Sequence, residues 1–302
     1  MKVNNQRAYR VEPATDPRMG MSPNLIGGFG GVFGRPGNQV ASGVFGAVIG
    51  GGGSAEFGPN EVTEHQGTVA GGAGNRAGNN DADLNNARFS TVGGGFGNQA
   101  SGFEATVGGG AFNAASGANS VVPGGSSNTA SGNFSFAAGR RAKAQHAGAF
   151  VWGDSTDADV SSNAANQFVV RASGGAIFYT NASLTTGASL AAGSGSWSSL
   201  SDRAVKTGLV PTNPKAVLER LAAMPIYEWS YQAQGLSVRH LGPTAQDFRA
   251  AFGLGEDDRH ISTVDADGVA LAAIQALYRE NQELKARVEL LEARTALGRE
   301  KP

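Results

Sequence analysis

The sequence lacks several features, and each absence excludes a class of protein or site. It contains no cysteine, which excludes disulfides, thiolate metal sites and cysteine nucleophiles. Charged residues make up only 16% of the chain and the formal net charge is −1, so electrostatics favours neither nucleic acid nor an anionic membrane as a partner. No stretch approaches the roughly 18 apolar residues of a membrane span, and the first residues lack the apolar run of a signal peptide. We therefore expect no membrane span, no export signal within these 302 residues and no nucleic-acid partner.

Glycine, by contrast, is abundant, and many of its 46 copies recur with a short period. Val92-Gly93-Gly94-Gly95 returns 15 residues later as Val107-Gly108-Gly109-Gly110, and after another 15 residues as Val122-Pro123-Gly124-Gly125. Ala137-Ala138-Gly139 continues the series. Other positions also fall in phase, namely Asn98, Asn113 and Asn128 and the Ala-Ser-Gly triplets that end at Gly102, Gly117 and Gly132. A fixed short period of this kind is typical of a stacked β-coil.

The same unit start recurs upstream at Ile26, Ile49 and Val69, where the spacings to the next start are 23, 20 and 23 residues. These spacings exceed the unit by 8, 5 and 8 residues, which indicates loops inserted at a turn. Glycine and asparagine tolerate the left-handed backbone that tight corners require. Small Ala, Ser and Val side chains suit a narrow interior. A disordered glycine-rich linker is the alternative, and the in-phase positions argue against it.

The Val-Gly-Gly-Gly-x-x-Asn-x-Ala-Ser-Gly units, over residues 26–151, resemble the head repeats of trimeric autotransporter adhesins. The resemblance implies a left-handed parallel β-roll in each chain, with three rolls packed about one axis. It also suggests a cell-surface or glycan ligand for the roll. The membrane anchor of those adhesins has no counterpart here, so a complete adhesin of that type is not expected. Residues 1–25, polar and punctuated by proline, are expected to form a lead-in.

Residues 152–199 depart from the repeat and are expected to form a β transition that ends in a Gly/Ser linker. Alternating and β-branched or aromatic residues predict strands at 150–152, 167–171 and 176–179. Asp154, Asp157 and Asp159 have part of the spacing of a calcium loop. They lack its sixth-position glycine and twelfth-position glutamate, so a solvated turn is expected.

Other sites that the sequence suggests are weak. Residues 72–77 fit a loose dinucleotide fingerprint, but they lie in a glycine-rich repeat with no helix after them. His240 and His260 lack the spacing of metal ligands, and no Gly-x-Ser-x-Gly elbow supports a Ser-His-Asp triad. We therefore expect no cofactor and no metal.

The composition after residue 199 changes to Leu, Glu, Arg and Lys with helical periodicity. Helices are predicted from 214 and at 244–252, with a strand at 226–231. Residues 263–302 are a coiled-coil candidate, with Ile274, Asn281 and Val288 at a positions and Leu277, Leu284 and Leu291 at d positions. β-branched a residues with leucine at d favour two strands, whereas the adhesin resemblance implies three. A single amphipathic helix packed on its own domain stays open as an alternative, because only about three heptads are present.

Between these two regions lies Leu200-Ser201-Asp202-Arg203-Ala204-Val205-Lys206. A serine followed five residues later by a lysine suggests a nucleophile and its amine partner. The spacing alone is common by chance. A lysine amine accepts a proton only when it is neutral, and burial favours that form. Proton transfer from Ser201 to Lys206 would therefore require that the domain is folded. In our interpretation it also requires that the trimer is assembled.

Three motifs in this region occur in order: Ser201-Asp202-Arg203-x-x-Lys206, residues 239–248 and residues 262–265. Together, over residues 200–295, they resemble the intramolecular chaperone auto-processing domain of phage tailspikes and tail fibres. The resemblance implies a homotrimeric chaperone that assembles the upstream fibre and then cuts itself off. It implies Ser201 as nucleophile, Lys206 as its partner and Leu200–Ser201 as the scissile bond. Positions 204 and 205 are Ala and Val, where tail-fibre members of the family commonly have Arg and Leu.

The sequence therefore predicts a mainly β, multidomain protein. It consists of a parallel β-roll of about 15-residue repeats, an α+β chaperone domain at 200–262 and a trimeric coiled coil at 263–302. The expected function is that of a homotrimeric fibre or surface protein, outside the cell or on a virion, with a serine endopeptidase that acts once on its own chain. A structural or adhesive fibre whose chaperone never cleaves is the alternative.

Overall fold

The computed structural model describes residues 2–3, 6–13, 22–32 and 34–299. The chain divides into two compact units, which are described separately. The first comprises residues 1–176 and 190–195, and the second comprises residues 177–189 and 196–302. Among the described residues, no helix is both long and apolar enough to cross a membrane.

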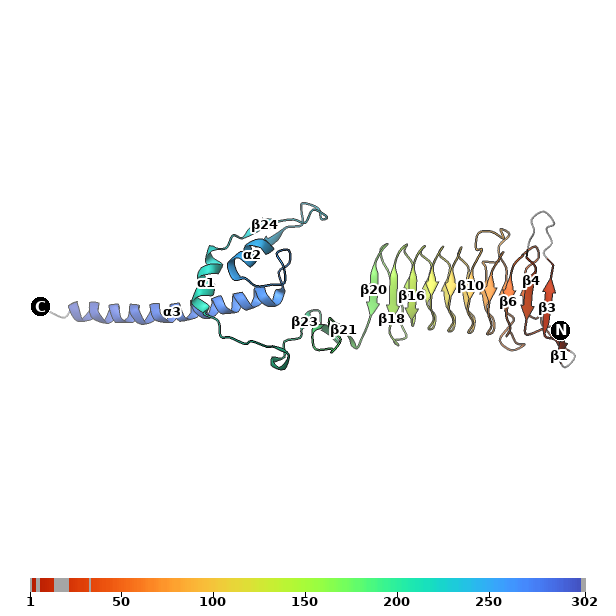
Figure 1. Cartoon of the computed structure of the whole chain (residues 1–302), viewed down its shortest axis with the longest axis horizontal. Coiled ribbons are helices and arrows are strands. Elements are labelled where there is room, and N and C mark those ends of the chain that lie inside the picture. The colour runs from red at the N-terminus through yellow and green to blue at the C-terminus, as the bar shows by residue number, and fades with distance from the viewer. Residues whose placement is uncertain (1, 4–5, 14–21, 33, 300–302) are drawn as a thin grey trace. The chain divides into compact units, whose positions relative to one another are not determined.

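The first unit is a roll built from two sheets whose strands stack side by side (Figure 1). One sheet has ten strands in the order β20-β18-β16-β14-β12-β10-β8-β6-β4-β3. Its strands are β3 (Tyr9–Glu12), β4 (Asn24–Gly27), β6 (Val48–Ile49), β8 (Thr68–Val69), β10 (Thr91–Val92), β12 (Thr106–Val107), β14 (Val121–Val122), β16 (Phe136–Gly139), β18 (Phe150–Gly153) and β20 (Phe168–Arg171). All neighbours pair in parallel except β3, which pairs antiparallel with β4.

The other sheet has eight strands in the order β19-β17-β15-β13-β11-β9-β7-β5. Its strands are β5 (Gln39–Val40), β7 (Glu61–Val62), β9 (Arg76–Ala77), β11 (Gln99–Ala100), β13 (Ala114–Ala115), β15 (Thr129–Ala130), β17 (Ala142–Ala144) and β19 (Val160–Ser161). Strands of the two sheets alternate along the chain, so each coil of the roll contributes one strand to each sheet. A separate antiparallel pair, β1 (Lys2–Val3) and β2 (Gln6–Arg7), precedes the roll.

Strand register confirms the predicted repeat. Val92 pairs with Val107 and Val107 with Val122, an offset of 15 residues in each case. The predicted upstream starts are also in register, because Ile26 pairs with Ile49, Ile49 with Val69, and Val69 with Val92. The roll continues through β19 and β20, beyond residue 151 where the repeat motif ends. The segment at 167–171, predicted as a strand of a transition region, is thus the last strand of the first sheet.

The extra residues of the long coils lie at corners, as the spacing indicated, but not all at the same corner. The first two insertions precede the second strand of their coils, and each contains a short antiparallel bridge, Val32–Arg35 and Ser54–Gly58. The third insertion, residues 78–90, follows β9 instead. The strand registers of both sheets are preserved on either side of each insertion. The roll therefore absorbs insertions without losing its stacking.

The interior of the roll is filled by small apolar side chains, and equivalent residues of successive coils stack on one another along the roll axis. Val69, Val92, Val107 and Val122 are fully buried, and so are the alanines Ala77, Ala100, Ala115 and Ala130 of the opposite sheet. The coils approach so closely that a Cβ on Gly95 would meet the carbonyl oxygen of Gly110 at 2.1 Å. This close approach explains why the repeat requires glycine at that position.

A file of buried asparagines links successive coils. Each side-chain Oδ1 accepts the main-chain N–H of the asparagine in the next coil, at 2.8–3.1 Å, through Asn38, Asn60, Asn75, Asn98, Asn113 and Asn128. Each side-chain Nδ2 donates to glycine carbonyls. Asn113, for example, reaches Gly109 O at 2.8 Å and Gly125 O at 3.0 Å. The asparagines thereby pair main-chain groups that the tight corners would leave unsatisfied.

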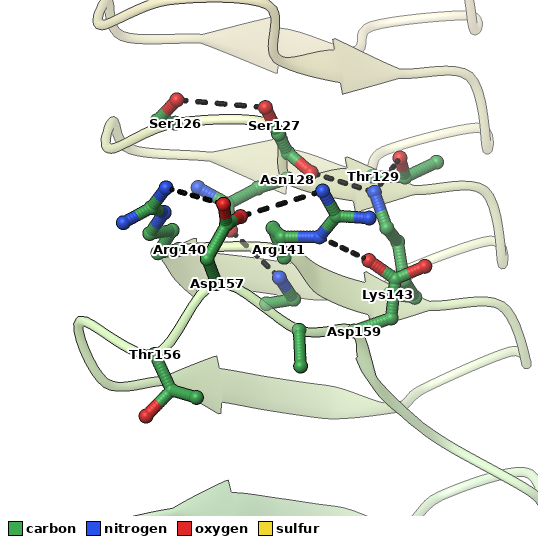
Figure 2. Close-up of polar contacts among 12 residues, drawn as sticks. Ser126, Ser127, Asn128, Thr129, Arg140, Arg141, Lys143, Thr156, Asp157 and Asp159 are labelled. Atoms are coloured by element: carbon green, nitrogen blue, oxygen red, sulfur yellow. Dashed lines mark hydrogen bonds and ion pairs between the residues drawn. The ribbon is translucent and has the colours of Figure 1, made fainter.

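The asparagine file meets a charged cluster at its last member, shown in Figure 2. Asn128 Oδ1 accepts the N–H of Ala142 at 2.9 Å. Nearby, Arg141 Nε pairs with Asp159 at 2.7 Å and Arg140 Nη2 with Asp157 at 2.9 Å. Asp154 pairs with Arg171 at 2.9 Å, and hydrogen bonds from Ser173 and Thr156 hold the pKa of this carboxyl far below its usual range. Arginine and main-chain donors therefore occupy the three aspartates of the predicted solvated turn.

Several buried polar side chains inside the roll have no hydrogen-bond partner, among them the hydroxyls of Ser90, Ser120 and Ser135 and one carboxylate. Glu64 is completely buried, and neither of its carboxylate oxygens has a hydrogen-bond partner. Burial, with a contribution from the nearby charges of Asp81 and Asp83 in the insertion at 78–90, raises its pKa from the ordinary 4.5 to about 7. The main-chain amides of Ala87 and Asn79 lie close enough to oppose this rise without reaching hydrogen-bond geometry.

After the roll the chain forms short strands, most of whose residues belong to the second unit, and then helices. The strands β21 (Gly175–Tyr179), β22 (Gly187–Ala191) and β23 (Trp197–Ser199) form a sheet in that order. A 3₁₀ turn η1 (Arg203–Val205) follows, and then come α1 (Pro214–Ala223), β24 (Tyr227–Trp229), β25 (His240–Gly242), α2 (Ala245–Phe252) and α3 (Thr263–Arg299). The helix predicted from 214 and the one at 244–252 are confirmed, and part of the strand predicted at 226–231 is present as β24.

Local sequence explains both short helices. Asn213 caps α1, its Oδ1 accepting the N–H of Lys215 at 3.1 Å, and proline occupies the first helical position. Thr244 caps α2 by accepting the N–H of Asp247, and Gly253 ends that helix in the left-handed conformation. Met224, Phe248 and Val269 form the buried core between α1, α2 and α3.

Helix α3 has two different faces. Val269, Ala272, Ala273 and Ala276 are buried, which places this face on the core of the unit. The predicted a and d residues are all exposed in the single chain, including Ile274 (61%), Leu284 (56%) and Leu291 (59%). The helix is therefore both packed on its own domain and apolar on a second face.

We predict that Asn113→Ala lowers the free energy of unfolding of the roll by about 2–4 kcal/mol. The substitution leaves the Asn128 N–H and the Gly109 carbonyl without their side-chain partner, while the Gly125 carbonyl keeps the N–H of Ala111. Each buried unpaired group costs about 1–3 kcal/mol. Chemical denaturation followed by circular dichroism would measure the change. Asn163→Ala, at an exposed asparagine, is the matched control and should change stability by less than about 0.5 kcal/mol. Equal effects of the two substitutions would contradict the role of the asparagine file.

We predict that Glu64→Gln stabilises the roll at pH 8 and has little effect at pH 4. The native pKa of about 7 exceeds the ordinary 4.5, so the native state binds more protons between these values. The free energy of unfolding of the wild type should therefore fall as pH rises from about 4.5 to 7, by at most about 3 kcal/mol. Denaturation at several pH values would test this, with the exposed Glu56→Gln as control. A pH-independent effect of Glu64→Gln would contradict the prediction.

Candidate functional site

The predicted scissile bond follows a strand that is hydrogen-bonded up to its last residue. β23 ends at Ser199, and the N–H of Leu200 donates to the carbonyl of Gly187 at 3.2 Å. Leu200 is half exposed, with 50% of its surface accessible. The residue before the bond is thus held by its N–H beside Gly187, the first residue of β22.

The residues after the bond turn back sharply. Asp202 is extended, and its side-chain Oδ1 accepts the N–H of Ala204 at 2.9 Å, which caps the turn η1. Two main-chain hydrogen bonds close the turn, from Val205 to Asp202 at 3.3 Å and from Lys206 to Arg203 at 3.2 Å. A tight turn of this length reverses the chain in three residues. The side chain of Lys206 is thereby returned to the start of the segment.

Ser201 and Lys206 are in direct contact. The Nζ of Lys206 donates to the Oγ of Ser201 at 2.6 Å, and both residues are exposed in the single chain. A hydroxyl within hydrogen-bond reach of an amine is the arrangement that a nucleophile and its base require. The two residues that the sequence singled out are therefore brought together, next to the bond between Leu200 and Ser201.

A pocket of about 350 Å³ lies beside the scissile bond, and sequence reasoning did not predict it. Its lining combines apolar and small polar groups from three strands and the segment after them: Ile177, Tyr179, Gly187, Ala188, Ser189, Ser198, Ser199, Leu200 and Ser201. The alternation at 176–179 predicted a strand but gave no indication of which segment pairs with it. The pocket gives the segment around the bond an apolar wall.

The two histidines considered from sequence lie elsewhere and have local partners. His240 stacks on Trp229 at 4.6 Å between ring centroids, and its Nε2 lies 2.8 Å from Gln234 Oε1. His260 Nδ1 lies 2.9 Å from Asp257 Oδ2. Within the part of the chain that the structure describes, no three His, Cys, Asp or Glu side chains are grouped to hold a metal ion. The glycine-rich residues 72–77 run into β9 of the roll, not into a helix.

Comparison with known families points to the same segment. The family described as chaperone of endosialidase matches residues 201–253, so the match starts at Ser201. It includes the turn η1 and the helices α1 and α2, and it supports a C-terminal chaperone domain of the type that assembles tail fibres and tailspikes. The repeats at 26–151 lie outside the match. No curated protein matches the chain.

Proposed function

We propose that this chain is a homotrimeric fibre or surface protein whose C-terminal domain assembles the trimer and then cuts the chain between Leu200 and Ser201. The single observation that carries the proposal is the 2.6 Å contact between Lys206 Nζ and Ser201 Oγ, at the first residue of the matched chaperone family. A serine–lysine contact at an arbitrary place would carry little weight. Its position at the start of this domain, directly after a half-exposed leucine, supports a role in processing.

The proposed reaction uses groups of this chain and one water molecule. The neutral amine of Lys206 accepts the hydroxyl proton of Ser201, and Ser201 Oγ attacks the carbonyl carbon of Leu200. The Leu200–Ser201 C–N bond then breaks, and the departing amino group of Ser201 takes the proton back from Lys206. This leaves an ester between the Leu200 carbonyl and Ser201 Oγ. Water hydrolyses the ester, releasing the Leu200 carboxylate and restoring the Ser201 hydroxyl.

Exposure of the pair suggests how the reaction is controlled. Both side chains are exposed in the single chain, and an amine in water is mostly protonated at neutral pH and cannot accept the serine proton. Removal from water favours the neutral amine. We propose that neighbouring chains cover the pair when the trimer forms. Cleavage would then begin only in a correctly assembled molecule, and the shared chain would supply the proximity.

The apolar second face of α3 supports assembly. Its a and d residues are exposed in the single chain, and Glu280 with Lys285 and Arg287 with Glu292 are complementary at the flanking g and e positions. Asn281 at an a position would fix the register. β-branched residues at the other a positions favour two strands, so the preference for three must come from the chaperone domain or the roll.

A non-cleaving structural or adhesive fibre is the second candidate. Ala204 and Val205 depart from the family pattern, and the solvent-exposed dyad of the single chain is compatible with a silent site. The roll also carries exposed aromatic side chains, among them Phe112 (58%) and Phe134 (70%), which could contact a ligand or a neighbouring chain. Cleavage of the purified protein distinguishes the two candidates.

We predict that the assembled wild-type protein splits into two fragments, with a new C-terminus at Leu200 and a new N-terminus at Ser201. Ser201→Ala should remain uncut while keeping its fold, because a methyl group replaces a hydroxyl on an exposed side chain. Lys206→Ala and Lys206→Arg should slow cleavage by about 100-fold or more, since a guanidinium stays charged and cannot act as a base. Intact-mass spectrometry over time would measure all four proteins.

Lys215→Ala, which removes an exposed lysine of α1, is the control and should cleave at the wild-type rate. The reaction should be first order and independent of protein concentration once trimers exist. Activity retained in Lys206→Arg would assign the lysine an electrostatic role at the developing oxyanion instead. A wild-type trimer that stays intact on prolonged incubation would exclude the proteolytic function and leave the structural fibre.

We predict that Leu284→Ser combined with Leu291→Ser abolishes trimer formation and, with it, cleavage. Each substitution removes a leucine from the proposed interface in every chain, at a typical cost of about 2–5 kcal/mol for a site buried in the assembly. Sedimentation velocity would report the oligomer and mass spectrometry the cleavage. Leu290→Ser is the matched control, because Leu290 is equally exposed at 56% but lies outside the a and d positions. Normal cleavage by the double variant would show that the last helix is not required.

A further inference from the structure

The peptide bond between Leu200 and Ser201 lies between two hydrogen bonds of different kinds. On its N-terminal side, the Leu200 N–H is held by Gly187 O at 3.2 Å. On its C-terminal side, Asp202 Oδ1 accepts the Ala204 N–H at 2.9 Å. The first bond belongs to the sheet and fixes the residue before the bond. The second depends on one side chain and fixes the turn that carries Lys206.

We propose that Asp202 is a positioning residue of the self-cleavage site and acts by capping the turn η1. This inference rests on the proposed proteolytic function and extends it to a residue that does not touch the reacting atoms. Among the described residues, the side chain of Asp202 bonds to the Ala204 N–H and makes no hydrogen bond or ion pair with Ser201 Oγ or Lys206 Nζ. Its effect on the pair passes through the main chain of the turn.

The turn has little else to hold it. Its two main-chain hydrogen bonds are long, at 3.3 and 3.2 Å, and none of its residues is buried. The side-chain bond from Asp202, at 2.9 Å, is the shortest of the three. A short 3₁₀ turn without packing is marginal in water, so its population depends strongly on the cap. When the turn opens, Lys206 is five residues from Ser201 along a flexible chain, and the 2.6 Å contact is lost.

The carboxylate of Asp202 could instead act by its charge, and the two roles are separable. A charge role requires an anion near the amine, whereas capping requires only a side-chain oxygen at the same position. Asparagine supplies that oxygen without the charge and caps as well as aspartate does. Alanine supplies neither. The pair Asp202→Asn and Asp202→Ala therefore separates capping from charge.

The test measures the first-order cleavage rate of the full-length, assembled protein by intact-mass spectrometry. Asp202→Ala should cleave about 5- to 10-fold more slowly than the wild type, the loss expected for a typical cap. Asp202→Asn should retain at least half of the wild-type rate. Arg203→Ala is the matched control, since the adjacent side chain makes no capping bond, and it should cleave normally. The pH at which the rate reaches half its maximum should be the same in all three variants.

Each other outcome contradicts the proposal. A slow Asp202→Asn variant, or a shifted pH profile, would assign the carboxylate a charge role. A wild-type rate in Asp202→Ala would mean that the turn forms without its cap. Hydrogen exchange of the Ala204 and Lys206 amides in an uncleavable Ser201→Ala background provides a readout that does not depend on cleavage. There, Asp202→Ala should lower protection and Asp202→Asn should not. If the wild type never cleaves but protection changes as expected, the proteolytic function fails while the capping of the turn stands.

Discussion

The structure of the roll depends on one constraint: its coils stack so closely that the main-chain groups at each tight corner are shielded from water and must be paired by the neighbouring coil. Most side chains in the narrow interior are valine, alanine, serine or asparagine, so apolar burial per residue is small. The asparagine file compensates by pairing the main chain at each corner, as in the bonds of Asn98 to Gly94 at 2.8 Å and to Gly110 at 2.9 Å. Stability therefore accumulates coil by coil, as in other stacked repeats.

The candidate site differs from the roll, because its residues are exposed and are not held by packing. Ser201, Asp202 and Lys206 are all exposed, and their arrangement is set by main-chain geometry over a few residues. A site of this kind forms and opens readily, because few interactions separate the formed turn from the open one. In the proposed function, cleavage waits for assembly. Neighbouring chains that cover the segment would stabilise the turn and favour the neutral form of the Lys206 amine. In this proposal the closely packed roll provides the stable fibre, and the weakly held turn allows cleavage to depend on assembly.

The sequence was sufficient to predict the features that repeat or that depend on nearby residues. The 15-residue period predicted the register of Val92, Val107 and Val122, because each identical coil meets the same neighbour. The spacing of Ser201 and Lys206 suggested a pair, the resemblance to the chaperone family implied it, and one short turn brings the two side chains into contact. Burial of Glu64 was not predictable, because an insertion 14 or more residues later contributes its surroundings. The pocket at Tyr179 and Gly187 was likewise missed, since pairing between short strands has no local signal.

The asparagine file also makes the roll modular. Every side-chain oxygen in it accepts from the coil that follows in sequence, from Asn38 to Asn128. The same amide also donates to a glycine carbonyl of that following coil, as Asn113 does to Gly125 at 3.0 Å. Each coil thus offers its successor the same pair of groups and meets the same pair in its predecessor. A roll of this kind can be lengthened or shortened by whole coils without a new kind of contact.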